Sequence, residues 1–258
     1  GTAEDFDLQQ AFVSYIAPLG NGLRFDAGKF GTHCGYEVIE GYDGYNDNAT
    51  RSFLFGYAEP ATHAGIKATY ALSETLSATV AVVNGWDNVK DSNSSKSLGG
   101  QLALTLSSDA VIYLNALYGP ERTGNDGDDR TFLNLVGSWR LGAGSAIGLD
   151  AVWATEEDAV GPGRDGTWGG VALYGRLGLS PSFALVARAE VFDDPDGVRT
   201  GTPQTLSELT LTPDLKLAPG LVLRADLRLD RSSRDVFEKE SGLTGTQPTV
   251  LLNALYSF

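Results

Sequence analysis

Alternation of apolar and polar side chains constrains this chain more than any other feature of its sequence. In the stretch VLRADLRLD, residues 222–230, the apolar set is Leu223, Ala225, Leu227 and Leu229, and the ionic set is Arg224, Asp226, Arg228 and Asp230. Successive side chains of a β-strand point to opposite faces, so this period of two predicts a strand with one apolar and one ionic face. Such a strand fits a soluble sandwich with leucines in its core, or a membrane barrel with leucines in lipid and ions in a wet lumen.

The same alternation recurs along the whole chain and predicts thirteen strands. We expect them at residues 5–17, 23–31, 63–72, 75–86, 96–106, 110–119, 129–141, 145–155, 167–179, 183–193, 204–217, 221–230 and 246–258. Most of these ranges reach about ten residues, which suits tilted membrane strands and exceeds the roughly five or six residues typical of soluble sheets. The fold class predicted is all-β, an antiparallel up-and-down transmembrane barrel.

The connections between these ranges support a barrel. Short turns at 18–22, 73–74, 107–109, 142–144, 180–182 and 218–220 alternate with long polar connections, and the two kinds never exchange order. This arrangement is typical of an outer-membrane barrel with turns in the periplasm and loops outside. Strand starts spaced 35 to 38 residues apart also leave a propeller as an alternative, although each unit holds two long strands rather than four short ones. A soluble β-sandwich is the other alternative.

Composition excludes several classes of protein and site. Of the 258 residues, 42% are hydrophobic and 10% aromatic, which excludes a disordered chain. The net charge of −14 argues against nucleic-acid binding. Cys34 is the only cysteine, so neither an intrachain disulfide nor a multi-cysteine metal site can form. His33 and His63 have no matching metal triad, and no GxSxG context is present, so we expect no metal, no cofactor and no catalytic site. No apolar run approaches about 18 residues, which leaves strands as the means of crossing a membrane.

The polar faces of the predicted strands would line the lumen. In a wide barrel water enters, so we expect these ions to be solvated or paired across neighbouring strands. The pore-lining candidates are Arg140, Arg176, Arg188, Glu190, Glu208, Asp214, Lys216, Arg224, Asp226 and Arg228.

The longest connection, residues 32–62, is aromatic and acidic and too apolar for a simple solvated loop. We expect it to fold into the lumen and narrow it, although a surface cap or a subunit contact would also fit. Ionised side chains at a constriction set selectivity. The candidates for this constriction loop are Glu37, Glu40, Asp43 and Arg51.

Several blocks of the sequence resemble one known family. They are DLQQAFVSYIAPLGNGLRFDAGKF, RSFLFGYAEPATHAGIKATYALS, VVNGWDNV, LYGPE, FDDPDGVRTG and the final TVLLNALYSF, which ends on an aromatic residue like the assembly signal of outer-membrane barrels. From about residue 5 to residue 258 the chain resembles the OmpL-like putative beta-barrel porins. The resemblance implies a Gram-negative outer-membrane location and passage of small hydrophilic solutes and ions, with no catalytic residue. A structural or adhesive barrel with a plugged lumen, or a barrel enzyme, is the alternative.

The odd strand number conflicts with the even number of single-chain bacterial barrels. The first residues, GTAEDFDLQQ, contain neither an initiator Met nor a signal segment, so we expect a mature chain or a fragment. Members of this family have about three further strands ahead of the matching segment, so we expect residues 1–258 to be one barrel domain that lacks its N-terminal strands. Sixteen strands are expected in the complete protein, with fourteen as the fallback. Expected partners are outer-membrane lipid, lipopolysaccharide, small solutes and further copies in a homo-oligomer.

Overall fold

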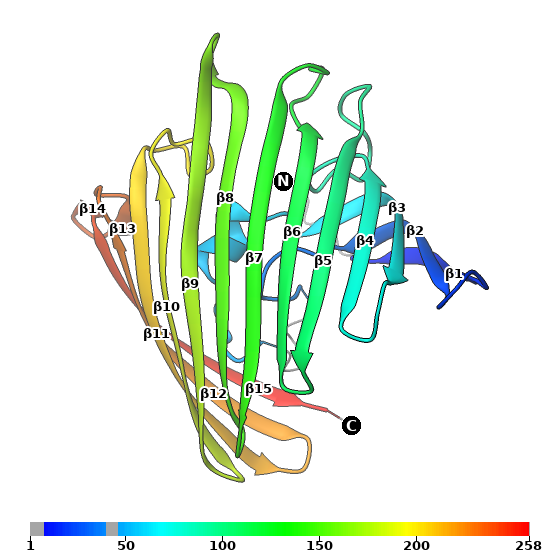
Figure 1. Ribbon diagram of the computed structural model, residues 1–258. Coiled ribbons are helices and arrows are strands. Elements are labelled where there is room, and N and C mark those ends of the chain that lie inside the picture. The colour runs from blue at the N-terminus through cyan, green and yellow to red at the C-terminus, as the bar shows by residue number, and fades with distance from the viewer. Residues whose placement is uncertain (1–7, 40–45, 258) are drawn as a thin grey trace.

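A computed structural model describes residues 8–39 and 46–257 of the chain. It is built almost entirely of β-strands (Figure 1). The strands are β1 (Ala11–Ala17), β2 (Leu23–Gly31), β3 (Thr62–Ala71), β4 (Leu76–Val83), β5 (Ser97–Ser107), β6 (Ala110–Pro120), β7 (Asp129–Gly142), β8 (Ser145–Gly161), β9 (Arg164–Ser180), β10 (Phe183–Asp194), β11 (Gln204–Ala218), β12 (Leu221–Ser232), β13 (Phe237–Lys239), β14 (Gly242–Thr244) and β15 (Thr246–Tyr256).

Thirteen of these strands form one antiparallel sheet in which each strand pairs with its neighbour along the chain, ending with β12 beside β15. The sheet is twisted and curved, with the long connections at one end and the short turns at the other (Figure 1). The prediction of thirteen consecutive antiparallel strands is therefore confirmed. Within the described residues no pairing joins β1 to β15. Sixteen strands in a longer protein stay a prediction.

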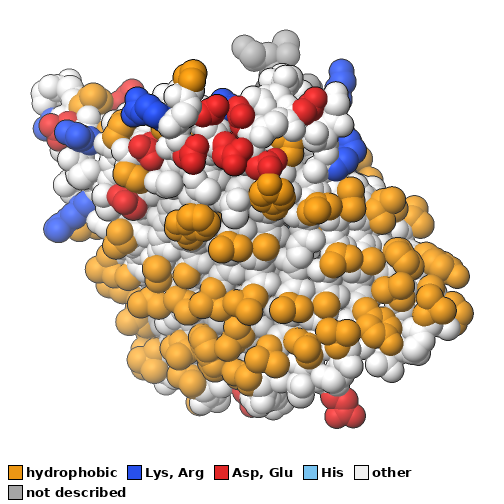
Figure 2. Space-filling model, turned by 45° about the horizontal axis from the view of Figure 1, so that its top comes forward, with side chains coloured by type: hydrophobic (Ala, Val, Ile, Leu, Met, Phe, Trp, Pro, Cys, Tyr) orange, Lys and Arg blue, Asp and Glu red, His pale blue; other side chains and the backbone are white. Residues whose placement is uncertain are grey.

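The two faces of the sheet differ as the alternation predicts. On β12, Leu223 and Leu227 are 37% and 49% exposed, whereas Arg224 and Asp226 are 8% and 0% exposed. A broad band of apolar side chains covers the convex face, and charged side chains gather above it at the loop end (Figure 2). A contiguous apolar band on a sheet needs a solvent that is itself apolar. The leucines of VLRADLRLD therefore face outward and its ions face inward.

Several strand limits differ from those expected, among them the end of β4, which lies at Val83 rather than at residue 86. Residues 8–10 precede β1, so the strand expected to begin at residue 5 begins at Ala11 instead. Strands β8 and β9 run past the expected limits to Gly161 and from Arg164, so the connection expected as a loop is mostly a protruding hairpin with a register shift between Glu156 and Gly161. A second small hairpin, β13–β14, lies in the last connection. Both additions are at the loop end, where polar residues obscure the period of two.

The connection between β2 and β3 lies on the concave side of the sheet, behind β6 to β9 in the view of Figure 1. It contains a short π-helix, η2 (Leu54–Ala58), that packs against β8 and β9. Across residues 8–39 and 46–257, no helix combines the length and apolarity needed to span a membrane.

Candidate pore and the inserted segment

The described parts of the β2–β3 connection, residues 32–39 and 46–61, are here called the inserted segment. Its ends meet where the Thr32 amide donates to the Ala61 carbonyl at 2.9 Å. The side chain of Asp87 accepts hydrogen bonds from the amides of Ala61 and Thr62 at 2.8 and 2.7 Å. The segment therefore leaves and rejoins the wall at one fixed point between β2 and β3.

The first arm of the inserted segment, residues 32–39, is held by polar side chains of β7 and β8. The Gly35 amide donates to Asn134 Oδ1 at 3.0 Å, and the Tyr36 amide donates to Asp150 Oδ2 at 2.8 Å. The ring of Tyr36 lies over Gly148, where a Cβ would come within 2.4 Å of the ring. A side chain at position 148 would displace the Tyr36 ring, so the first arm can pack against β8 here because residue 148 is a glycine.

The second arm, residues 46–61, is held by polar and ionic side chains of β11 and β12. Arg224 donates to the Asn46 carbonyl at 2.7 Å, and Asn48 donates to the Thr212 hydroxyl at 2.7 Å. Asp226 accepts both the amide and the hydroxyl of Thr50, at 2.6 and 2.7 Å. Irregular backbone inside a membrane protein needs such partners, because lipid supplies none.

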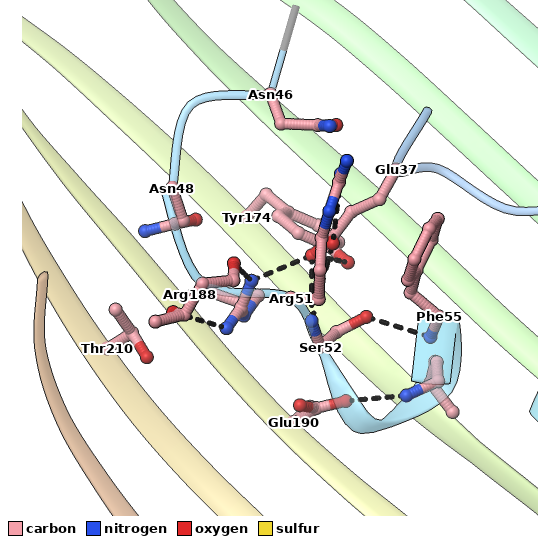
Figure 3. A network of polar contacts seen from close by, with 12 residues as sticks. Glu37, Asn46, Asn48, Arg51, Ser52, Phe55, Tyr174, Arg188, Glu190 and Thr210 are labelled. Atoms are coloured by element: carbon pink, nitrogen blue, oxygen red, sulfur yellow. Dashed lines mark hydrogen bonds and ion pairs between the residues drawn. The ribbon is translucent and has the colours of Figure 1, made fainter. Parts of the chain in front are cut away.

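Arg188 of β10 lies at the centre of these contacts (Figure 3). Its guanidinium is fully buried, donates to Glu208 at 2.5 and 3.2 Å, to Glu37 at 2.7 Å, and to the Thr50 carbonyl at 2.7 Å. Glu37 also accepts the Ser52 amide, which joins the two arms. A buried charge is tolerated only with this number of partners. Arg188 thus fixes both arms of the inserted segment to the wall.

Glu190, two residues along β10, holds the start of η2. Its carboxylate accepts the amides of Phe53 and Leu54 at 2.5 and 3.1 Å. These are donors that the first helical turn leaves without an intrahelical partner. At the other end, the Trp168 indole donates to the Ala58 carbonyl at 3.2 Å. Wall side chains therefore satisfy both ends of the helix.

The ten predicted pore-lining residues have three different environments. Most of them contact the inserted segment or one another; these are Arg176, Arg188, Glu190, Glu208, Asp214, Arg224, Asp226 and Arg228. Lys216 is exposed near the short turns. Arg140 pairs with Asp109 there, with both side chains mostly exposed. Of the two expected environments, solvation or pairing across neighbouring strands, Arg188 and Asp226 have the second, with Glu208 and Thr212 of β11 as partners, and the inserted segment excludes water from both.

The four predicted constriction residues divide in two. Glu37 is buried, and Arg51 lies beside it, with Nη1 3.6 Å from Glu37 Oε2 and its guanidinium 4.5 Å from the centre of the Phe55 ring. Glu37 therefore joins the segment to the wall through Arg188, and Arg51 is an internal contact of the segment. Glu40 and Asp43 lie outside the described residues. A role for any of the four at a constriction stays a prediction.

Sequence reasoning missed several residues that hold the segment. Asn134 lies between Phe132 and Val136 on the inner face of β7, and Asp150 lies between Gly148 and Val152 on that of β8, so a polar side chain between apolar or small neighbours was the available signal. Asn46, Asp47 and Asn48 lie in the NDNAT stretch, which looks like a polar turn. No period in the sequence links these residues to strands more than a hundred positions away.

Titratable groups of the segment are strongly affected by burial. Burial and the nearby Asp150 carboxylate raise the pKa of Glu59 well above its ordinary value, so the side chain is held neutral. Burial also raises the pKa of the Cys34 thiol, which makes it unreactive. Burial lowers the pKa of His33 to about 4. In the part of the chain that is described, no three His, Cys, Asp or Glu side chains form a group that could hold a metal ion.

Two of the cavities beside the inserted segment have the predicted pore-lining residues or the first arm in their walls. A cavity of about 430 Å³ lies between its first arm and the inner faces of β5 to β7, with Gln101, Asn115 and Ser138 in its wall. A second cavity, of about 580 Å³, is bounded by the short turns 143–144 and 180–182 and by Arg176 and Lys216. Asp47 lines both. We call them the middle cavity and the turn-end cavity.

An antiparallel sheet with an apolar outer face and a polar inner face, partly filled by its own connection, is the architecture of an outer-membrane channel. The family model described as "Putative beta-barrel porin-2, OmpL-like" matches residues 1–258. The chain belongs to this porin family. It is an outer-membrane porin of a Gram-negative bacterium, and it forms a channel for passive diffusion of small hydrophilic solutes. No curated protein sequence is significantly similar to this porin.

Solved structures of similar fold are outer-membrane proteins. The outer membrane channel DcaP of Acinetobacter baumannii superposes with a TM-score of 0.67 at 10% identity, covering 95% of this porin and 83% of DcaP. An anion-selective porin from Comamonas acidovorans superposes with a TM-score of 0.61 at 13% identity, and the match covers 100% of this chain and 76% of that porin. The trimer form of OmpT, an outer membrane protein of Vibrio cholerae, superposes with a TM-score of 0.57 at 14% identity, and the match covers 91% of this chain and 76% of OmpT. At these identities the likeness establishes the fold.

Proposed function

We propose that the inserted segment narrows the lumen and that solutes pass between it and strands β5 to β7. The middle cavity supports this route, because its wall carries neutral hydrogen-bonding groups, Gln101, Asn115 and Ser138, that can replace part of a solute's hydration. At the level of Arg188, the segment packs directly on the opposite wall and leaves this side chain fully buried. At that level the open side is therefore the side of β5 to β7.

The observation that carries this proposal is the set of contacts between the segment and the wall. Among the described residues of the segment, the amides of residues 35, 36, 50, 53 and 54 and the carbonyls of residues 46 and 58 are paired with wall side chains. A segment with this many wall contacts stays in the lumen during conduction, so the channel conducts without a large movement of the segment. We expect an ohmic channel without a saturable, energy-coupled cycle.

Cysteine modification in planar bilayers tests the route. Ser138 lines the middle cavity, so Ser138→Cys in a Cys34→Ser background should lose most of its conductance when treated with a bulky charged methanethiosulfonate. Thr212→Cys is the matched control, because Thr212 is also on the inner face but is fully buried under Asn48. Unchanged conductance in modified Ser138→Cys channels would reject the route.

A structural barrel with a plugged lumen is the second candidate. The observation that favours it is the full burial of Arg188 and Asp226 beneath the inserted segment, which closes the lumen beside these two side chains. The same recordings separate the two, since a plugged barrel gives no single-channel steps from the correctly folded wild-type protein.

We further propose that the protein is not an enzyme and that it forms a homo-oligomer in contact with lipopolysaccharide. The inward carboxylates are engaged by backbone amides, as for Glu190 and Asp226, which supports a positioning role for them. The trimer form recorded for OmpT supports an oligomer. A lipase assay on the solubilised protein tests the first statement, and we expect no activity. Cross-linking in outer-membrane vesicles tests the second, and we expect products larger than one chain.

A further inference from the structure

The turn-end cavity contains more positive than negative charge, in a chain whose net charge is −14. Its ionic wall residues are Arg176, Lys216, Arg224, Asp47 and Asp214. With three cations and two anions, the cavity carries one net positive charge. A water-filled space with excess positive charge at a channel end concentrates anions.

The two arginines of this cavity are not equally available. Arg224 is nearly buried, and it donates to Asp214 at 2.8 Å and to the Asn46 carbonyl at 2.7 Å. The Arg176 side chain is 26% exposed and pairs with Asp47 at 2.8 Å and, more loosely, with Asp214 at 3.4 Å. Lys216 is exposed two residues after Asp214 on the same strand. Arg176 and Lys216 are thus the cations that a solute can reach.

Asp47 differs from both of its neighbours. Asn46 and Asn48 are both buried; Arg224 of β12 donates to the Asn46 carbonyl, and Asn48 donates to Thr212 of β11. The Asp47 side chain is instead 34% exposed and lines both cavities. Its carboxylate reaches Arg176 because the two flanking asparagines hold the backbone in place. A half-exposed ion pair exchanges readily with competing ions, because its Coulomb energy in water is small. The Arg188 network, by contrast, is closed to solvent.

We propose that Arg176 and Lys216 form a binding site for small carboxylate-bearing anions at the turn end of the lumen, and that Asp47 is a built-in competitor for it. The Asp47 carboxylate occupies the place that a solute carboxylate takes at Arg176. Exchange between the two passes the solute from one cavity to the other. The proposal rests on the proposed diffusion route, and it adds the chemical class of solute.

The test uses the full chain in planar bilayers with succinate as the probe and neutral succinamide as its uncharged counterpart. Wild-type chloride current should be reduced saturably by succinate added on the turn side and unaffected by succinamide. Asp47→Asn should raise the chloride-to-potassium permeability ratio about two- to threefold, the effect of one unit charge in a watery passage, and should lower the half-blocking succinate concentration by a similar factor. Arg176→Gln and Lys216→Gln should each weaken the block.

Asp109→Asn is the matched control. It also removes one carboxylate from an arginine near the short turns, but the Arg140–Asp109 pair is exposed and neither residue lines the two cavities. Its permeability ratio and succinate block should equal those of the wild type. If Asp47→Asn behaves like Asp109→Asn, or if succinamide blocks as well as succinate, the anion site is rejected while the porin route stands. Absence of wild-type conductance rejects the route and the site together.

Discussion

Removing the guanidinium of Arg188 should cost more stability than any other single change on the inner wall. The side chain is 0% exposed, and its loss in Arg188→Met leaves Glu208 and Glu37 buried, with Arg228 at 3.4 Å and Arg51 at 3.6 Å as their remaining cations. Breaking a buried ion pair by removing one partner typically costs about 3–5 kcal/mol. We expect a loss in this range for the free energy of unfolding.

Urea titration of the refolded protein in lipid vesicles, followed by tryptophan fluorescence, measures this loss. Arg140→Met provides the matched control, because its ion pair with Asp109 is 68% and 60% exposed and should contribute only about 0–1 kcal/mol. The triple variant Arg188→Met, Glu37→Gln, Glu208→Gln should regain part of the stability, since the two buried carboxylates that pair with Arg188 become uncharged amides. A loss below about 1 kcal/mol for Arg188→Met would refute the assignment of Arg188 as the central anchor of the inserted segment.

Three further predictions follow from exposure and burial. Leu227→Arg places a charge on the lipid face and should cost about 2–4 kcal/mol if the site is near the bilayer midplane, by the same urea titration, whereas Leu227→Ile should be nearly neutral. Spin labels at Leu215 should be relaxed by oxygen and labels at the adjacent Lys216 by a water-soluble nickel chelate, and the reverse would contradict the orientation of the sheet. Folding raises the pKa of Glu59 above its ordinary value of 4.5, so the folded state binds the proton more tightly than the unfolded state. The free energy of unfolding should therefore fall as the pH rises above about 4.5. Glu59→Gln should flatten this pH dependence, and an unchanged slope in the variant would show that another group causes it.

Most of the sheet could be predicted from the chain because its information is local. A strand with lipid on one side and polar contacts on the other must alternate, so Leu209, Leu211 and Leu215 against Glu208, Thr212 and Asp214 identify β11 and both of its faces without any tertiary information. The short turns then determine the order of neighbouring strands. The pattern fails where both faces are wet, as in the β8–β9 extension beyond Glu156 and in the β13–β14 hairpin.

The positions of the inner charges depend on tertiary structure. The sequence indicates that Arg188, Glu208 and Asp226 face inward, but it contains no period that says whether they meet water or another segment. Arg188 contacts Glu37 and Thr50, which lie 151 and 138 residues away along the chain. Asp226 contacts Thr50, which lies 176 residues away. Those pairings exist because the sheet curves around a connection whose backbone needs donors and acceptors. The sequence by itself therefore determines a barrel wall and its two faces, and the tertiary structure decides which inward ions anchor the inserted segment and which, like Arg176 and Lys216, face an open cavity.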